Sequence, residues 1–355
     1  MNRIECYRQA LRQSDADAFL LTAAPTRSHI TATSCLEGMV FLTETDCRFF
    51  TDSRYLEAAQ RELDGFPVLP VDREHGYLSR IAEASAENRI ERIGYEDGYL
   101  TAGELDLFRE KLSVELIPVQ SILRPLRQSK DPPELEHLRR AQEITDKAYA
   151  ELLPEIRVGM TERELQAELI YRLYRCGGEG LSFDPIVVSG PNTSMPHGVA
   201  GSRKLAPGDF ITMDFGCVVS GYCSDMTRTV ALGFVTDEMK TVYKTVLAAQ
   251  LAGIAATKAG VTGQQADEAA RGVIREAGYG EYFGHSYGHG VGLEIHETPN
   301  CAPSWTSPLP AGAVCSAEPG IYLPGKFGVR IEDVVIVRED GCEILTKSGK
   351  TLTIL

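Results

Sequence analysis

Four acidic residues lie within short segments of this chain that are otherwise apolar and strand-like. Asp214 lies in ITMDFG and Asp225 in SDMTRTV, whereas Glu318 lies in SAEPGIY and Glu332 in GVRIEDVVIV. One such acid is usually a surface residue, but ionised carboxylates are rarely buried without partners, because the charged form loses its hydration. The combination therefore requires a fold that brings these carboxylates to shared protons or to a cation.

The segments that carry Asp214 and Asp225 are expected to form a β-hairpin about a turn at Ser220-Gly221. This pairing places Asp214 opposite Thr227 and diagonal to Asp225, and a register shifted by one residue on each side pairs the two acids directly. Both registers point the two carboxylates to the same face of the sheet. Like charges this close repel one another unless a shared proton or a divalent metal ion lies between them.

Four of the seven histidines fall between residues 197 and 296, and each lies among Gly or Pro residues: His197, His285, His289 and His296. His289, in HSYGHGVG, offers a neutral nitrogen ligand. Four carboxylates and one imidazole carry more negative charge than one metal ion needs, and the charges balance at two divalent ions. Oxygen-rich ligation with one imidazole fits Mn, Co, Fe or Zn better than a thiolate-type zinc site.

Arg330 lies two residues before Glu332, so the two side chains share one face of a strand while Asp333 points the other way. Arg330 is therefore a candidate partner for the Glu332 carboxylate.

The chain has 355 residues, enough for two domains. Residues 1–125 are predicted to form a small α/β domain, with helices over 4–12, 54–63 and 102–112 and strands over 18–21, 39–42, 47–51 and 93–95. Residues 126–355 are predicted to form the second domain, whose first helix is capped by Asp131. Later helices are expected to start at Thr161, Thr236 and Thr262, and strands to cover 186–189, 210–215, 224–230, 313–318 and 329–337.

Composition excludes several classes of partner. Thirty-six basic and fifty acidic residues give a formal net charge of −14, which argues against nucleic acid. No apolar run reaches the roughly 18 residues that span a bilayer, so no membrane partner is expected. Nine cysteines without a CxxC pair favour a reducing cytoplasm, and Cys217, Cys223 and Cys315 are expected to act as small apolar residues beside the acids.

Five motifs, in this order, resemble the ligand motifs of the pita-bread metallopeptidases: MDFG, SDMTRT, GHGVG, AEPGIY and RIEDVV. That group includes Xaa-Pro aminopeptidases, Xaa-Pro dipeptidases (prolidases) and methionine aminopeptidases. The resemblance is strong over about 130–355 and weaker before it, where DSRY at 52–55 is similar to a creatinase-type N-terminal domain. It implies an α/β (α+β) chain, in which a C-terminal pita-bread (creatinase/aminopeptidase) domain follows a smaller creatinase-type N-terminal α/β domain.

The resemblance also implies a ligand set for two divalent metal ions. Asp214 would chelate the first ion, Asp225 and Glu332 would bridge both, and His289 and Glu318 would complete the second. Manganese is favoured as the metal, with cobalt, zinc or iron as alternatives.

Catalytic roles are implied for five residues. His285 or His296 would stabilise the oxyanion, and Glu318 would shuttle a proton to the leaving nitrogen. His197 and Arg330 would hold the substrate on its proline side. There Arg330 would clamp the C-terminal carboxylate of the substrate, or it would instead form a salt bridge to a ligand carboxylate.

The implied activity is hydrolysis of the Xaa-Pro bond at the N-terminus of short peptides, by a hydroxide that two metal ions activate. Such an enzyme is either an Xaa-Pro aminopeptidase or an Xaa-Pro dipeptidase, and its partners would be a proline-containing peptide and a second copy in a homodimer. The alternatives are a methionine aminopeptidase-like or creatinase-like hydrolase, and a non-catalytic pita-bread binding protein.

Overall fold

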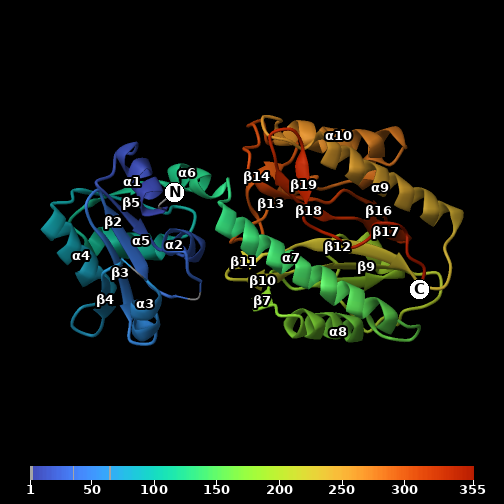
Figure 1. Cartoon of the computed structure of the whole chain (residues 1–355), viewed down its shortest axis with the longest axis horizontal. Coiled ribbons are helices and arrows are strands. Elements are labelled where there is room, and N and C mark those ends of the chain that lie inside the picture. Colours follow the sequence, from blue (N-terminus) through green and yellow to red (C-terminus); the bar gives the residue numbers. More distant parts are fainter. Residues whose placement is uncertain (1–2, 35, 64) are drawn as a thin grey trace. The chain divides into compact units, whose positions relative to one another are not determined.

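The computed structural model describes residues 3–34, 36–63 and 65–355. The chain divides into two compact units, Met1–Arg127 and Gln128–Leu355 (Figure 1). None of the described helices is both long and apolar enough to cross a membrane.

The N-terminal unit is built on a six-stranded sheet in the order β4-β3-β2-β1-β5-β6, in which β2 runs antiparallel to both of its neighbours. The other neighbouring strands are parallel. Its strands are β1 (Ala18–Leu21), β2 (Met39–Thr43), β3 (Cys47–Asp52), β4 (Val68–Val71), β5 (Arg92–Tyr95) and β6 (Glu115–Pro118). Its helices are α1 (Arg3–Arg12), α2 (Ala24–Thr31), α3 (Leu56–Glu62), α4 (Tyr77–Asn88), α5 (Ala102–Lys111) and α6 (Gln120–Leu123).

Helices cover both faces of this sheet, because alternate residues of a strand point to opposite sides. Phe19 and Leu21 pack in one core with residues of α1, α2, α3 and α6, while Ala18 and Leu20 pack in another with residues of α4 and α5. All the elements predicted for this part of the sequence are present, with small shifts of their ends. Five further elements were not predicted: α2, β4, α4, β6 and α6.

The C-terminal unit has four long helices, and each begins at a capped residue as predicted. They are α7 (Pro132–Leu152), α8 (Glu162–Arg175), α9 (Asp237–Ala256) and α10 (Gly263–Glu276). The strands of the first half are β7 (Gly180–Leu181), β8 (Ile186–Ser189), β9 (Phe210–Phe215), β10 (Cys217–Val219), β11 (Tyr222–Cys223) and β12 (Met226–Ala231). Those of the second half are β13 (Gly288–Gly290), β14 (Glu297–Cys301), β15 (Val314–Ala317), β16 (Gly320–Leu323), β17 (Phe327–Arg330), β18 (Asp333–Val337) and β19 (Cys342–Ile344).

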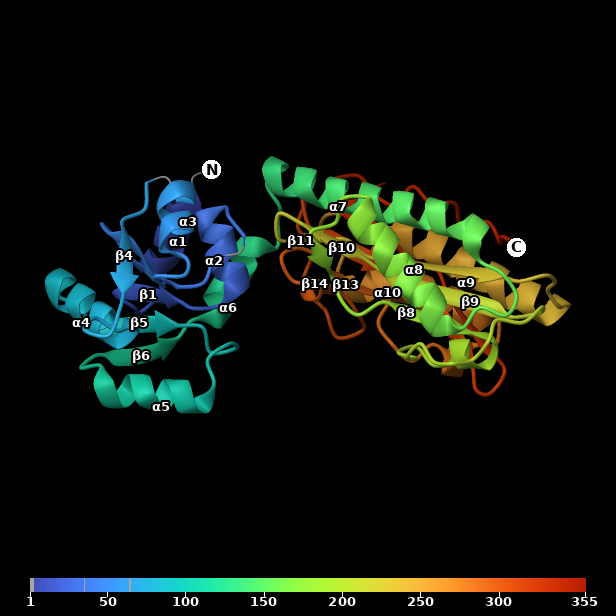
Figure 2. The same ribbon diagram turned by 90° about the horizontal axis from the view of Figure 1, so that it is seen from below.

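The strands of this unit lie between two pairs of helices (Figures 1 and 2). Ile144 of α7 and Leu165 of α8 share a core with Met213 of β9. Val246 of α9 and Ala270 of α10 share a second core with strands of the other half. The site described below is therefore held between two buried cores.

Strands β9 to β12 form one long hairpin with a two-residue turn. Both turn residues, Ser220 and Gly221, have positive φ angles of 50° and 84°, as a tight hairpin turn requires. Asp214 pairs with Thr227, which is the first of the two registers considered from the sequence. The ladder breaks at Gly216 and at Ser224-Asp225, so Asp225 precedes β12 and does not lie within it.

Strands β15 to β18 form a second hairpin that is also interrupted. Ala317 pairs with Asp333 and Gly320 with Arg330, so one register continues across the break and Glu318 falls opposite Glu332. The single strand predicted over 329–337 is wrong, because the chain leaves the ladder at this point. There the Glu332 N–H donates to the Thr227 carbonyl of the first hairpin, 3.1 Å away.

Candidate metal centre

All the site residues predicted from the sequence line one cavity of about 870 Å³ in the C-terminal unit. The acidic members come from the two interrupted hairpins. His285, His289 and His296 come from the segment between the hairpins, whereas His197 comes from the loop before β9. The residues are Asp214, Asp225, Glu318, Glu332, His197, His285, His289, His296 and Arg330.

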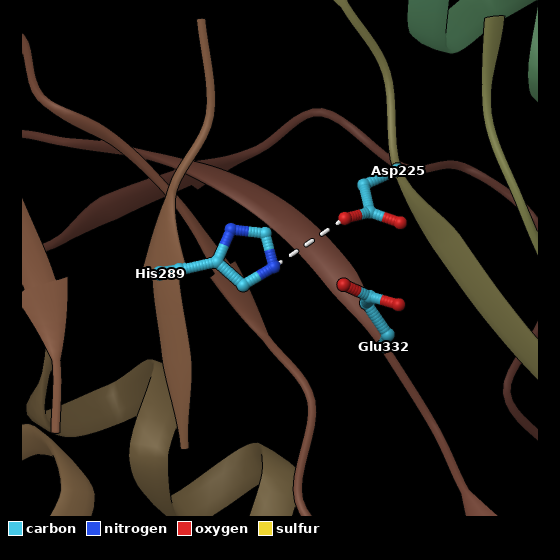
Figure 3. A group of neighbouring side chains, drawn as sticks. All are labelled: Asp225, His289 and Glu332. Atoms are coloured by element: carbon cyan, nitrogen blue, oxygen red, sulfur yellow. Dashed lines mark ion pairs between the residues drawn. The ribbon is translucent and has the colours of Figure 1, made fainter. Parts of the chain in front are cut away.

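Asp225, His289 and Glu332 form a compact group in this cavity, and one donor atom of each lies within 4.8 Å of the others. The three side chains reach this point from separate segments and converge (Figure 3). His289 Nε2 lies 3.6 Å from Asp225 Oδ2 and 3.2 Å from Glu318 Oε1. The group is a candidate metal site that Glu318 extends.

The backbone fixes the orientation of the His289 ring. Its Nδ1 lies 3.1 Å from the Gly290 carbonyl oxygen, which can only accept, so Nδ1 carries a proton. In the neutral ring the lone pair is then on Nε2, which faces the carboxylates. Ser316 supports this arrangement, because its hydroxyl accepts from the backbone N–H of His289 and donates to Glu318 Oε1, both at 3.0 Å.

Asp214 is joined to His285 by a chain of hydrogen bonds. Arg330 donates from Nη2 to Asp214 Oδ2 at 2.6 Å and from Nη1 to the Tyr322 hydroxyl at 2.8 Å. His285 donates from Nδ1 to the Ser286 carbonyl, so its Nε2 accepts the Tyr322 hydroxyl proton at 2.8 Å. Both ring nitrogens of His285 are therefore engaged, as is the Arg330 guanidinium.

The pKa values of the acids in the cavity are shifted in opposite directions. Burial, followed by the charges of Glu332 and Asp214, raises the pKa of Asp225 well above its ordinary value. Burial and the charge of Glu318 likewise raise the pKa of Glu332. Burial also acts on Glu318, but its hydrogen bond to His289 lowers its pKa to about 2. Although burial lowers the pKa of His289, Glu318 and Glu332 raise it to about 9.

Three carboxylate oxygens show that the residues fit a divalent cation. Asp214 Oδ1, Asp225 Oδ1 and Glu332 Oε1 are buried and have no hydrogen-bond partner among the described residues. Buried oxygens of this kind ordinarily have partners, and an ion supplies one. A bound divalent ion would also remove the repulsion that raises the pKa values of Asp225 and Glu332.

His296 and His197 complete the histidine set. The His296 ring packs edge-on against the His289 ring, with centroids 4.3 Å apart. Burial and then the charge of His289 lower the pKa of His296, which favours its neutral form. His197 is exposed and lines the cavity on the loop after Pro196.

Sequence reasoning assigned no role to several polar groups that hold these residues. Thr227 donates to Glu332 Oε2 at 2.7 Å and accepts from Arg330 Nε at 3.0 Å. Its place opposite Asp214 in the predicted hairpin was the available signal. Tyr322 and Ser316 gave no comparable signal, because the reach of a hydroxyl depends on how the second hairpin kinks. Cys217, Cys223 and Cys315 are buried free thiols.

Models of two protein families match this chain. Residues 136–339 match Metallopeptidase family M24, and residues 3–129 match the Creatinase/Prolidase N-terminal domain. The chain is 37% identical to the uncharacterized peptidase YqhT of Bacillus subtilis (strain 168), over 99% of this chain and 100% of that protein.

Two solved structures are similar over almost the whole chain. One is the Xaa-Pro dipeptidase from Bacillus anthracis, with a TM-score of 0.96, 40% identity and 99% of both chains covered. The other is the X-Pro aminopeptidase from Thermotoga maritima MSB8, with a TM-score of 0.92, 37% identity and 100% of both chains covered. The expected fold, a creatinase-type domain followed by a pita-bread domain, is confirmed, as is a metal-dependent peptidase. This chain belongs to Metallopeptidase family M24.

Proposed function

We propose that this protein hydrolyses the Xaa-Pro bond at the N-terminus of short peptides with two divalent metal ions bound. The observation that carries this proposal is the converged group of Asp225, His289 and Glu332, together with the buried carboxylate oxygens that have no partner among the described residues. The names of the similar solved structures, a dipeptidase and an aminopeptidase acting at proline, support the substrate class.

The proposed ligands are Asp214, Asp225, His289, Glu318 and Glu332. Bound divalent ions would lower the pKa of a water molecule and polarise the scissile carbonyl. Carboxylate oxygens with one imidazole favour manganese, with cobalt, zinc or iron as alternatives. Cytoplasmic location and a homodimer complete the proposal, and light scattering tests the dimer.

The side chains of this chain would divide the remaining work. His296 is proposed to donate to the developing oxyanion, since a neutral imidazole beside His289 can present an N–H to the substrate. Glu318 has a second carboxylate oxygen, with which it would carry a proton to the leaving proline nitrogen. His197 would contact the proline side of the substrate from its exposed position on the rim.

His285 and Arg330 are proposed to act mainly by holding other groups. The Tyr322 hydroxyl donates to His285 Nε2 and accepts from Arg330, and Arg330 also holds Asp214. This favours the salt bridge over the substrate clamp for Arg330. His285 would become a donor for the oxyanion only if its Nε2 took up a proton and the Tyr322 hydroxyl turned away.

The test is a paired assay of the manganese-loaded protein on Ala-Pro and Ala-Pro-Ala, with Ala-Ala-Ala and Met-Ala-Ser as controls. Cleavage of Ala-Pro alone identifies a dipeptidase, and cleavage of the tripeptide before proline identifies an aminopeptidase. Release of Met or cleavage of Ala-Ala-Ala at similar rates would contradict proline specificity. Inactivity of a protein shown to hold metal would contradict the whole proposal.

A further inference from the structure

An ion pair outside the cavity, in which the carboxylate is buried and the guanidinium is partly buried, holds the loop over 283–287. Asp267 on α10 has a side chain that is 2% exposed, and it receives Arg271 at 2.7 Å, one helical turn later. The described lining of the cavity includes His285 and Ser286 of this loop but neither Asp267 nor Arg271. The pair therefore reaches the site only through the loop.

Arg271 contacts both the backbone of the loop and the ring of Phe283. Its Nη1 donates to the Phe283 carbonyl at 2.9 Å, and its Nη2 donates to the His285 carbonyl at 2.7 Å. The guanidinium also lies 4.2 Å from the centroid of the Phe283 ring. That ring meets the His285 ring edge-on, with centroids 5.0 Å apart. Arg271 thus positions His285 in two ways, through the His285 carbonyl and through the Phe283 ring.

Asp267 holds the other end of the same loop. Its Oδ1 accepts from the Tyr287 N–H at 2.9 Å. The Tyr287 carbonyl in turn accepts from the Glu318 N–H at 2.8 Å, and His289 follows two residues later. The ion pair therefore connects α10 to the segment that carries His289 and, through Tyr287, to the backbone of Glu318.

We propose that Asp267 and Arg271 are positioning residues of the peptidase reaction, which fix the loop over 283–287 and so set the places of His285 and Glu318. The proposal rests on the proposed function for its kinetic consequence. Catalytic rates fall steeply when reacting groups move by about 1 Å, so a loosened loop lowers turnover more than substrate binding.

Arg271→Lys is the informative variant, because lysine keeps a positive charge beside buried Asp267 but cannot donate to both loop carbonyls. We expect kcat on the proline peptide to fall at least about tenfold, with KM changed less than about threefold and Tm within a few degrees of wild type. Arg275→Lys is the matched control, since Arg275 pairs with exposed Glu268 on the same helix and does not contact the loop. It should leave kcat unchanged.

A double variant, Asp267→Asn with Arg271→Gln, removes both charges and leaves no buried charge unpaired, so it guards against misfolding of a single variant. It should reproduce the loss of kcat. Wild-type kcat in Arg271→Lys, or an equal loss in Arg275→Lys, would overturn the proposal.

Hydrogen exchange separates this proposal from the proposed function. Amides over 283–287 should exchange faster in Arg271→Lys than in wild type, while those of β9 and β12 stay unchanged. If the wild-type protein cleaves no proline peptide, the proposed function fails, and the exchange comparison still tests the loop. Unchanged exchange over 283–287 would overturn the positioning role by itself.

Discussion

Glu332 and Asp333 are adjacent in the chain, yet their carboxylates lie on opposite sides of it. Glu332 faces Asp225 and His289 in the cavity. Asp333 receives Arg228 at 2.8 Å and Lys350 at 2.6 Å in the interior. The first carboxylate is crowded by like charge and the second is matched by two cations, so neutralising each should have opposite effects.

Glu332→Gln should stabilise the metal-free protein, because it removes a buried carboxylate that burial and Glu318 disfavour in its charged form. We expect Tm in the presence of a chelator to rise by about 2–4 °C, the shift for roughly 1 kcal/mol in a domain of this size. Activity with added metal should be lost. A lower Tm than wild type under chelation would contradict the account of this site.

Asp333→Asn should destabilise the protein by about 3 kcal/mol, because it leaves Arg228 and Lys350 without their buried counter-charge. Denaturant unfolding measures this loss. Metal affinity should change little, since Asp333 points away from the cavity. A near-neutral effect on stability would show that water reaches Arg228.

The stability of the metal-free protein should fall as pH rises. Asp225 and Glu332 have raised pKa values in the folded protein, so their stabilisation is present below about pH 4 and is lost as pH rises through the folded values. His289 has the same sign, and its contribution is lost as pH rises through about 9. Glu318 has the opposite sign, because its pKa is lowered to about 2. Its stabilisation is present above about pH 4 and is lost as pH falls through about 2.

Thermal unfolding between pH 5.5 and pH 8.5, with a chelator and with saturating manganese, checks this expectation. Tm should decline with pH in the chelated protein and decline less in the loaded one, because the ion replaces the shared protons. Equal slopes in both conditions would show that the cavity carboxylates do not set the trend.

Substitution of Arg330 distinguishes the two roles considered for it. If Arg330 holds Asp214 and Tyr322, Arg330→Lys should lower kcat by roughly a hundredfold on both Ala-Pro and Ala-Pro-Ala amide. If instead it clamps a substrate carboxylate, KM for Ala-Pro alone should rise. We expect the first result, and steady-state kinetics on the two substrates decides it.

Gly216→Ala should disrupt the first hairpin, because a Cβ there would lie 1.9 Å from the Ser224 carbonyl oxygen. Ser224 precedes Asp225, so metal affinity and Tm should both fall. Gly103→Ala in α5 is the control, since a Cβ there meets nothing within 4 Å. Alanine in an exposed helix should leave Tm unchanged or raise it slightly. Wild-type metal affinity in Gly216→Ala would contradict the tight contact.

The sequence predicted the helices of the C-terminal unit well, because capping residues close in sequence determine where these helices start. Asp131, Thr161 and Thr262 each form a capping box with a residue three positions later. The hairpin about Ser220-Gly221 was also predicted, but its register was left open between two alternatives, of which the structure has the one that pairs Asp214 with Thr227. These features depend on residues close in sequence.

The candidate site was predicted as a set of residues but not as an arrangement. The break at Glu332 was missed, because a run of apolar and β-branched residues reads as one continuous strand. What interrupts it is a hydrogen bond to Thr227. The hydrogen bonds of Arg330 and His285 with Tyr322 could not be predicted either, because they depend on how two hairpins pack together.

The contact between Arg330 and Asp214 joins positions 116 residues apart. Neither hairpin alone carries the full set of cavity acids, so a nascent half-unit offers no complete cage for an ion. Closing loops of this length is slow compared with forming a helix or a single hairpin. We therefore expect the centre to form late in folding, so that a metal ion that binds early meets only part of its ligand set.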